Sequence, residues 1–295
     1  IRISTFHSLG LDIIRKEYQT LGFKKNISIL DEQDKFKVLQ DILDNSQHQL
    51  DKAQISPLSW QISDWKNQAI LPAQAMSLAE DAQQQFAAAL YEQYQQYNRV
   101  CNAVDFDDLI LTPLVLFNEH ASVLEKWQNS TRYLLLDEYQ DTNTTQYEFF
   151  KHLVGAIGQF TVVGDDDQSI YAWRGANPEN LFTLKKDFPR LEIIKLEQNY
   201  RSNQRILKAA NQLISNNPHL YEKNLWSDIK SDEKINVIRC KDEFSESQQI
   251  AAEISRIKFK HRASNADFAI LYRSNHQARL LEKSLRELSL PYTIS

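Results

Sequence analysis

The N-terminal third of the chain carries apolar residues at helical spacing. After the alternating residues 1–5, which predict a short strand, apolar side chains from Ser8 to Tyr18 recur at helical intervals until Gly22 ends the pattern. A second helix is predicted from Asp31, because Asp is a favourable N-cap and an apolar stripe follows it.

Two further helices are predicted before about residue 117. Pro57 follows Ser56 and suits the first position of a helix, where its missing N–H is not needed. Residues 73–98 are rich in Ala, Gln and Glu and contain no Gly or Pro, so they predict one long helix. We therefore expect an all-helical block in residues 9–117.

From residue 131 the pattern changes to short apolar runs that alternate with amphipathic segments, as in parallel sheets covered by helices. Strands are predicted at 133–136, 160–163, 191–196, 234–239 and 267–272. Helices are predicted from Thr144 and at 179–186, 203–214, 245–258 and 277–288. The sequence thus predicts an α/β fold in which two α/β units follow one helical block.

Composition places this chain of 295 residues, 42% of them apolar and 25% charged, among globular proteins with room for two domains. Its apolar runs are strand-sized, and a membrane span needs roughly 18 such residues, so we expect no span. The chain starts with Ile, has Met76 as its one Met and lacks a basic segment before an apolar stretch. We therefore expect no signal peptide and an excerpt of a longer protein.

Cysteine usage and net charge exclude few functions. Cys101 and Cys240 form no CxxC pair, which argues against a disulfide framework or a zinc site and fits a cytoplasmic protein. A net charge of −5 argues against a globally basic nucleic-acid binder. Positive charge can nevertheless be confined to one groove, and residues 1–30 have a local excess of Lys and Arg, although such charges are usually only solvated.

The sharpest chemical feature is a pair of acids, Asp137 and Glu138, directly after the strand at 133–136. Ligands of parallel α/β sheets bind at the carboxyl ends of the strands. In ATPases an Asp at this place holds Mg²⁺, and a neighbouring Glu orients and deprotonates water. Acids also follow strands as turn or N-cap residues, and the fragment by itself does not separate these two interpretations.

The strand at 160–163 also ends in polar residues, Gly164 to Gln168. Two adjacent strands with such ends indicate a site. The amide of Gln168 can both donate and accept, which suits contact with a phosphate or a water molecule. The three acids at 165–167 either hold a metal ion or form a solvated turn, and we favour the turn for Asp166.

Aromatic and basic residues follow in the next two loops. Tyr171, Trp173 and Arg174 lie after the second acidic segment, and Tyr200 and Arg201 lie after the predicted strand at 191–196. Trp usually packs in a core, but aromatic rings interleaved with Arg also stack on bases of single-stranded nucleic acid. An Arg can bind a phosphate through its forked donors.

Six blocks spread over most of the chain resemble, in order, the helicase motifs of the UvrD, PcrA and Rep family of superfamily 1 DNA helicases. They are TFHSLG at 5–10, DFDDLI at 105–110, LLLDEYQDTN at 134–143, VVGDDDQSIYAWRGA at 162–176, LEQNYRS at 196–202 and AILYRSNHQAR at 269–279. The segments between them are most similar to the Rep branch of this family.

The resemblance implies ATP and Mg²⁺ as cofactors. It makes Asp137 the magnesium ligand and Glu138 the general base. It places Gln168 at the γ-phosphate, Arg174 and Arg201 at phosphate or at the surrounding acids, and Tyr200 against adenine.

The resemblance also implies contacts with single-stranded DNA. Tyr171 and Trp173 would stack on bases, Thr5 and His7 would touch the backbone of the strand, and Arg273 would face it. A His is more often an ordinary polar residue, so the role of His7 rests on the motif. Asp105, Asp107 and Asp108 are interpreted as helix-start residues favoured by the helix dipole rather than as catalysts.

The fold implied is a RecA-like parallel-sheet core of the P-loop NTPase type. Its first domain would comprise residues 1–8 and 118–198, and a helical insertion in that domain would comprise residues 9–117. Residues 199–295 would form the start of a second RecA-like domain. None of the six glycines belongs to a G-x-x-x-x-G-K-[ST] loop, the motif that cradles phosphates in this class. We therefore expect this segment alone to be inactive.

The intact protein would move 3′ to 5′ on single-stranded DNA, unwind forked duplexes and serve replication restart, with replisome proteins as possible partners. A helicase-nuclease subunit of the RecB or AddA type would share these motifs but carry a nuclease domain further along. A non-catalytic DNA-binding module would have lost Glu138 or Arg201, and both are present.

Overall fold

The computed structural model describes residues 1–48, 50–155, 158–177, 179–217, 221–231 and 233–294, apart from the side chain of Arg174. The chain forms two units. The first comprises Ile1–Glu197 and Asn211–Leu225, and the second comprises Gln198–Ala210 and Trp226–Ser295.

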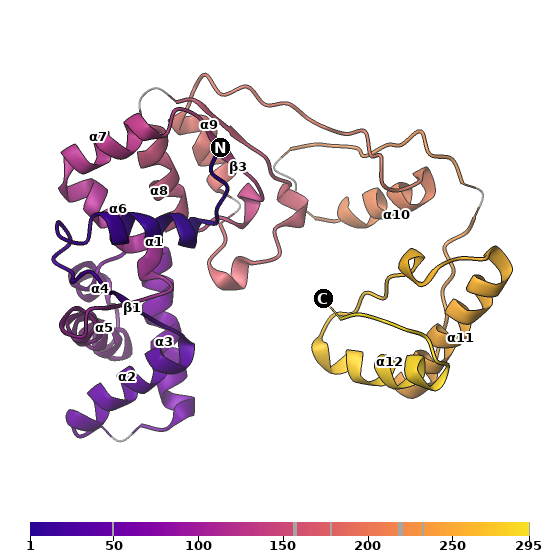
Figure 1. The fold of residues 1–295 in the computed structure, drawn as a ribbon, viewed down its shortest axis with the longest axis horizontal. Coiled ribbons are helices and arrows are strands. Elements are labelled where there is room, and N and C mark those ends of the chain that lie inside the picture. The colour runs from indigo at the N-terminus through magenta and orange to yellow at the C-terminus, as the bar shows by residue number, and fades with distance from the viewer. Residues whose placement is uncertain (49, 156–157, 178, 218–220, 232, 295) are drawn as a thin grey trace. The chain divides into compact units, whose positions relative to one another are not determined.

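The N-terminal part of the first unit is a group of helices that holds one short parallel ladder (Figure 1). The helices are α1 (Phe6–Lys16), α2 (Glu32–Asn45), α3 (Lys52–Asn67), α4 (Pro72–Leu78), α5 (Ala82–Val100), α6 (Asp108–Glu119) and α7 (Ala121–Ser130). The ladder pairs β1 (Ser28–Leu30) with β2 (Ala103–Asp105) in parallel. The predicted helical block therefore contains two strands that the pattern did not indicate.

Aspartate caps set where several of these helices begin. Asp31 caps α2 as predicted. The prediction that the next helix opens at Ser56 and Pro57 is wrong, because Asp51 caps α3 and starts it at Lys52. Pro57 lies inside this helix and removes one hydrogen-bond donor from it.

The single helix predicted at 73–98 is two helices, α4 and α5. Ala79 has extended backbone angles and ends α4. The carboxylate of Asp81 accepts the N–H of Gln84 at 2.7 Å, which caps the start of α5. A good N-cap inside an otherwise uninterrupted helical composition is enough to divide it.

The two largest apolar cores of the described helical part hold it together. In the first, from α2, α3 and α5, Leu39, Ile55 and Tyr91 are fully buried. The second joins α1, α6 and α7 to α8 (Thr144–Val154) through residues such as Leu116 and Phe149. The second core connects the helical part to the α/β part of the same unit.

The α/β part of the first unit contains a second parallel ladder, of β3 (Leu134–Leu136) and β4 (Phe160–Val162), as predicted. Its core includes the ring of Phe150 from α8 and the side chain of Leu184 from α9 (Asn180–Asp187). The 3₁₀ turns η1 (Tyr139–Asp141), η2 (Asp166–Gln168) and η3 (Ala172–Arg174) follow the strands.

The second unit is mainly helical. Helices α11 (Glu243–His261) and α12 (Asn275–Glu287) share a small core that includes Ala251 and Leu285, and η4 (Asn265–Asp267) lies between them in sequence. Helix α10 (Gln204–Ile214) crosses the division between the two units. The helices predicted at 203–214, 245–258 and 277–288 are thus confirmed with small shifts of their ends.

Four predicted strands are wrong: those at 1–5, 191–196, 234–239 and 267–272. Among the described residues only β1 to β4 are strands. A strand persists only where a neighbour completes its hydrogen-bond ladder, and the four segments have none in the described part of the chain. Leu196, Val237 and Leu271 are accordingly 82%, 87% and 93% exposed.

No described helix is long and apolar enough to cross a membrane.

Candidate functional site

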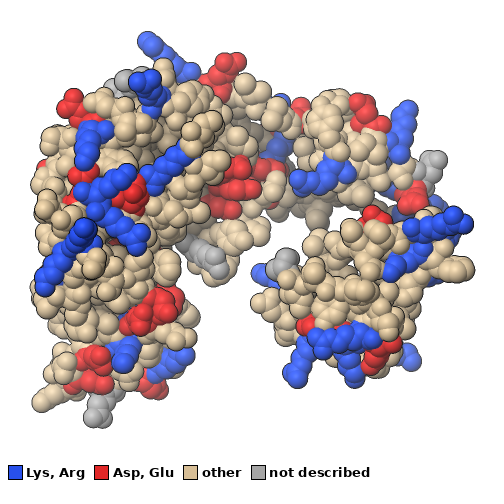
Figure 2. All heavy atoms as spheres, viewed as in Figure 1, with Lys and Arg blue, Asp and Glu red and all other residues tan. Residues whose placement is uncertain are grey.

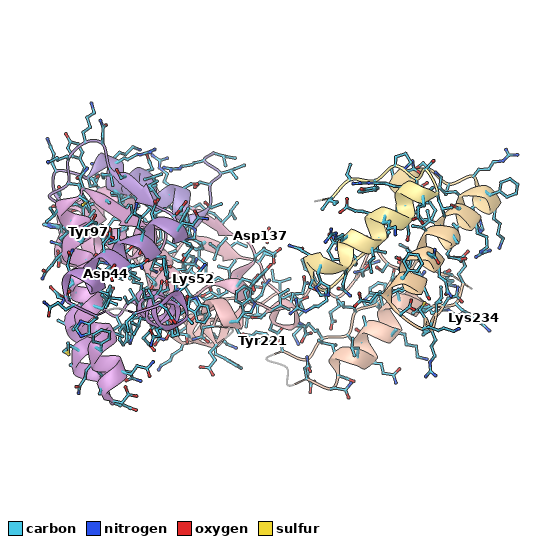
Figure 3. The ribbon with its side chains drawn as sticks, turned by 90° about the horizontal axis from the view of Figure 1, so that it is seen from below. Asp44, Lys52, Tyr97, Asp137, Tyr221 and Lys234 are labelled. Carbon is cyan, nitrogen blue, oxygen red and sulfur yellow. The ribbon has the colours of Figure 1, made fainter. Side chains whose placement is uncertain are left out.

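Strands β3 and β4 end side by side, and acidic residues follow both. Val163 donates its N–H to the carbonyl of Leu136 (2.8 Å), and Tyr139 donates its N–H to the carbonyl of Val163 (3.0 Å). Asp137 and Glu138 lie between these two bonds and are exposed. Figure 3 labels Asp137 at the edge of this unit, away from the helices that carry Asp44, Lys52 and Tyr97.

The backbone at this strand end is unusual. Glu138 has a left-handed conformation, with φ 52° and ψ 43°, which costs a residue with a Cβ atom about 1–2 kcal/mol. The N–H of Glu138 donates to Oδ1 of Asp137 at 3.0 Å, which braces the turn. The turn directs two adjacent carboxylates to the surface at one strand end.

A buried amide connects the two strand ends. Gln140 is only 1% exposed. Its Nε2 donates to Oε2 of Glu138 at 2.7 Å, and its Oε1 accepts the N–H of Asp165 at 3.0 Å. Gln140 is not among the residues predicted for the site, because a Gln in a polar segment after a strand gives no signal of burial.

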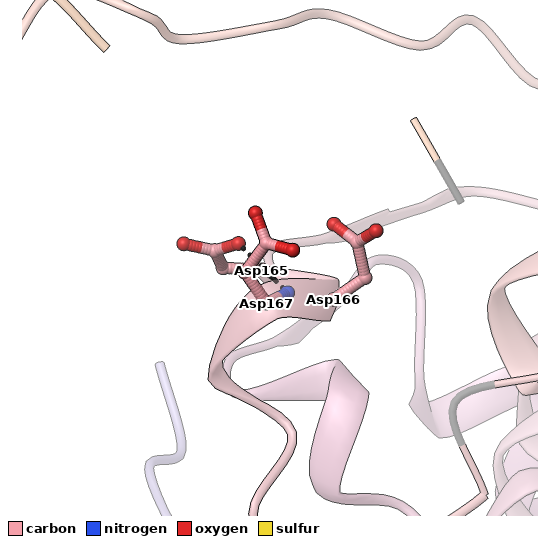
Figure 4. A group of neighbouring side chains, drawn as sticks. All are labelled: Asp165, Asp166 and Asp167. Atoms are coloured by element: carbon pink, nitrogen blue, oxygen red, sulfur yellow. Dashed lines mark hydrogen bonds between the residues drawn. The ribbon is translucent and has the colours of Figure 1, made fainter. Parts of the chain in front are cut away.

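The acids after β4 are tied together by a lysine distant in sequence. Lys223 pairs with Asp165, Asp166 and Asp167, the last at 3.0 Å. Figure 4 shows the three carboxylates on one turn, where the N–H of Asp167 donates to Asp165. Their oxygens lie close enough together to hold a metal ion, but the ammonium group of Lys223 occupies their vicinity.

Asp166 lies in a turn as predicted, at the start of η2, but the expectation that this turn is solvated there is wrong, because its side chain is 7% exposed and pairs with Lys223. Burial raises the pKa of Asp165, but hydrogen bonds from Lys223 and Gln168 outweigh burial and leave the pKa below its usual value. Nε2 of Gln168 donates to Asp165 at 2.7 Å, and Gln168 itself is exposed. The Lys223 partnership could not be read from the sequence, since 56 or more residues separate the partners.

The aromatic residues after η2 lie at the surface of the same unit. Trp173 is 73% exposed and Tyr171 is 38% exposed, with ring centroids 6.4 Å apart. The alternative that Trp173 packs in the core is therefore wrong for this structure. The predicted role of Arg174 concerns a side chain outside the described part of the structure.

Thr5 and His7 lie at the start of α1. Thr5 is exposed and caps the helix by accepting the N–H of Ser8 at 3.2 Å. Burial lowers the pKa of His7, against the opposing charge of Asp107. The ring of His7 meets Phe106 edge to face, with centroids 6.3 Å apart. Figure 2 shows basic side chains gathered over α1, α6 and α7, and acidic side chains over the part that contains β3.

The remaining site predictions fall in the second unit. Tyr200 is 78% exposed, and its hydroxyl donates to Gln198 at 2.7 Å. Arg201 is exposed, and its N–H donates to the side chain of Asn199 at 2.9 Å. Arg273 is exposed, with its N–H bonded to Oε1 of Gln277 at 3.0 Å.

A second acidic cluster lies after β2 in the helical part and is buried. Nζ of Lys66 lies 2.8 Å from both Asp105 and Asp108, and these three side chains are at most 4% exposed. Lys35 pairs with Asp107 at 3.4 Å. Asp107 and Asp108 lie at the start of α6 as predicted, but the same prediction is wrong for Asp105, which ends β2. The buried lysines were not anticipated.

Burial raises the pKa of Asp105, but the charges of Lys66 and Lys35 outweigh burial and hold the pKa well below its usual value. Burial together with the charge of Asp105 raises the pKa of Asp108 to about 6. Tyr94 donates a hydrogen bond to Asp105 at 3.0 Å. This cluster joins α2, α3, α5 and β2 to the start of α6.

Comparison with known proteins identifies the family. The model of the UvrD/REP helicase N-terminal domain matches residues 1–189, and that of the UvrD-like helicase C-terminal domain matches residues 194–295. The chain belongs to the UvrD/REP helicase family. The resemblance predicted from the motif blocks is thereby confirmed, and the coarse fold is that of UvrD-like helicase domains, with helices and small parallel sheets.

Individual members of this family are similar over the whole chain. The ATP-dependent DNA helicase Rep of Salmonella typhimurium is 49% identical over 295 residues, and that of Escherichia coli is 48% identical. The ATP-dependent DNA helicase PcrA of Bacillus subtilis is 40% identical over 296 residues. The chain spans 44% of the length of the two Rep proteins and 40% of that PcrA.

Proposed function

We propose that the protein containing this chain hydrolyses ATP to move 3′ to 5′ along single-stranded DNA and to unwind duplex DNA, as in replication restart. The observation that carries the proposal is the exposed pair Asp137 and Glu138 at the joined ends of β3 and β4. Membership of the helicase family suggests ATP hydrolysis as the reaction, and the two carboxylates are groups suited to that reaction.

Asp137 would hold Mg²⁺. The fit is good, because Asp137 is exposed and its Oδ1 is occupied by one backbone N–H, which leaves the carboxylate a second oxygen for a cation. Mg²⁺ is usually bound through one or two carboxylates together with water and substrate phosphates. When bound, Mg²⁺ would neutralise charge on the phosphates of ATP.

Glu138 would act as the general base for the attacking water. Its carboxylate is exposed, and Oε2 is held by Gln140, so that Oε1 is the oxygen suited to accept a proton. Gln168 would contact the γ-phosphate, since it is exposed and anchored to Asp165. Arg174 and Arg201 would stabilise charge on the transferred phosphoryl group, and Tyr200 would stack on adenine.

The DNA strand would contact exposed groups. Tyr171 and Trp173 offer rings for stacking on bases. Thr5, His7 and Arg273 would contact the backbone of the strand.

In terms of domains, residues 1–8 and 118–198 would belong to a first RecA-like domain with 9–117 inserted in it. Residues 199–295 would begin a second RecA-like domain. ATP hydrolysis by the intact protein would be coupled to its movement along the DNA.

Unwinding assays with the full-length protein test the proposal. Duplexes with a 3′ tail, a 5′ tail or blunt ends are incubated with protein, ATP and Mg²⁺. We expect unwinding of the 3′-tailed duplex together with ATP hydrolysis that single-stranded DNA stimulates. Preference for the 5′ tail would contradict the polarity, and absence of DNA-stimulated hydrolysis would contradict the function.

A further inference from the structure

We propose that Gln140 is a positioning residue that holds the carboxylate of Glu138 for proton abstraction and links it to the end of β4. The inference rests on the proposed function, because it assigns Gln140 a part in the same reaction. Its basis is one buried amide with a hydrogen bond to each strand end, 2.7 Å to Glu138 and 3.0 Å to the N–H of Asp165.

The partners fix the orientation of this amide. The backbone N–H of Asp165 can only donate, so the carbonyl oxygen of Gln140 faces it. An ionised carboxylate can only accept, so the NH₂ group faces Glu138. A rotation of the amide by 180° would break both hydrogen bonds, and neither Glu nor Met at position 140 could replace both.

Close packing keeps the amide in this place. Gln140 is 1% exposed, and its backbone carbonyl accepts a hydrogen bond from the hydroxyl of Ser169 at 3.3 Å. A Cβ atom added to Gly164 would lie 2.9 Å from Oε1 of Gln140. The absence of a side chain at Gly164 thus provides the space that the amide occupies.

Glu138 needs such a support because its side chain is exposed on a left-handed turn. A free glutamate side chain visits many rotamers, and a general base must lie within hydrogen-bond reach of the proton that it takes. The bond from Gln140 occupies Oε2 and restricts where Oε1 lies. The base is therefore fixed by a buried group rather than by its own packing.

The same amide connects Glu138 to Gln168. Asp165 donates its N–H to Gln140, and its carboxylate accepts from Gln168 at 2.7 Å. A displacement of the segment after β4 would therefore be transmitted to Glu138 through Gln140 and its two hydrogen bonds.

Steady-state ATP hydrolysis by the full-length protein tests this inference through a double-mutant cycle. Gln140→Met removes both hydrogen bonds at similar volume, and we expect kcat to fall about 10- to 100-fold with KM for ATP changed less than about 3-fold. In a Glu138→Gln background the same substitution should change kcat less than about 3-fold, because Gln140 acts through Glu138. Equal losses in both backgrounds would overturn the inference.

A second variant reaches the same amide from the other strand. Gly164→Ala should displace the end of Gln140 and lower kcat, with little further loss when it is combined with Gln140→Met. Gln159→Met, an exposed Gln before β4, is the matched control and should retain wild-type kcat. If Gln140→Met does not fold, the cycle is measured with Gly164→Ala and Glu138→Gln, and additive losses there would overturn the inference.

The outcomes separate this inference from the proposed function. Normal turnover of Glu138→Gln would refute the role of Glu138 itself. Low turnover of Glu138→Gln with normal turnover of Gln140→Met would refute only the positioning role.

Discussion

The first unit contains two short parallel ladders with acidic residues at their ends. The two groups of acids differ in burial, and burial decides whether they maintain the fold or can bind a ligand. At the end of β2, Asp105 and the nearby Asp108 are buried and share the ammonium group of Lys66. After β3, Asp137 and Glu138 are exposed. Burial with a counter-ion makes the first cluster a structural connection, whereas exposure at a strand end leaves the second available to a ligand.

The difference shows why acids after a strand do not by themselves indicate a catalytic site. Both clusters follow short β strands, and both lie in blocks that resemble helicase motifs. A buried carboxylate must keep its charge neutralised by its neighbours, so it is not available to bind phosphate-bound Mg²⁺. A lysine buried beside the acids therefore distinguishes a structural cluster from one that can bind a ligand.

The largest expected effect is on stability and concerns the buried cluster. Lys66→Met leaves Asp105 and Asp108 buried without the cation that they share, and we expect a loss of about 3–5 kcal/mol in the free energy of unfolding. Lys37→Met, at an exposed position of α2, is the control and should change stability by less than about 0.5 kcal/mol. Urea unfolding of the full-length variants measures both, and equal stabilities would mean that the buried pair contributes nothing.

A smaller effect is expected on DNA binding at the exposed part of the same unit. Trp173→Ala should weaken binding of single-stranded DNA by about 1–3 kcal/mol if its ring stacks on a base. Titration at several salt concentrations checks this, since loss of stacking should leave the salt dependence nearly unchanged. A large loss of stability instead would return Trp173 to a structural role.

An effect of similar size concerns pH and the buried Asp108, which is surrounded by Lys66 of α3, Gln95 of α5 and Asp105 of β2. Because its pKa is raised to about 6 from the ordinary value of 3.8, the folded state retains a proton that the unfolded state releases. The contribution of Asp108 to the free energy of unfolding is therefore lost as pH rises from about 4 to about 6. Asp105, whose pKa is lowered, contributes stability that is lost only as pH falls below its unfolded value.

Asp108→Asn isolates the contribution of Asp108, because the remaining groups are the same in both proteins. Between pH 4.5 and 6.5 the wild type should lose about 1–3 kcal/mol more unfolding free energy than the variant. Urea unfolding at the two pH values provides the measurement. A parallel pH dependence of the two proteins would show that Asp108 titrates normally.

The sequence predicted the parts of this molecule that depend on local signals. Asp31 and Asn143 mark helix starts through their own side chains, and the apolar runs before Asp137 and Gly164 form β3 and β4. Where one local signal competed with another, the prediction failed. Pro57 favours a helix start, but Asp51 provides the cap and α3 begins before Pro57.

The rest depended on contacts between distant residues. The segments at 191–196 and 234–239 have strand-like sequences but no neighbouring strand among the described residues, so no ladder forms. Lys66 and Lys223 pair with acids at least 39 residues away, and neither has a local signal that separates it from a surface lysine. Likewise, Gln140 acquires the N–H of Asp165 as a partner only when β3 and β4 lie side by side.

The central claim is that the exposed acids act in hydrolysis and the buried acids maintain the fold. It is tested by removing one charge from each cluster with the same chemical change, Glu138→Gln and Asp105→Asn, in the full-length protein. DNA-stimulated ATP turnover per folded molecule and the free energy of unfolding are measured for both. We predict that Glu138→Gln lowers turnover at least about 100-fold without loss of stability, and that Asp105→Asn loses stability and retains turnover. Near-normal turnover of Glu138→Gln would contradict the account.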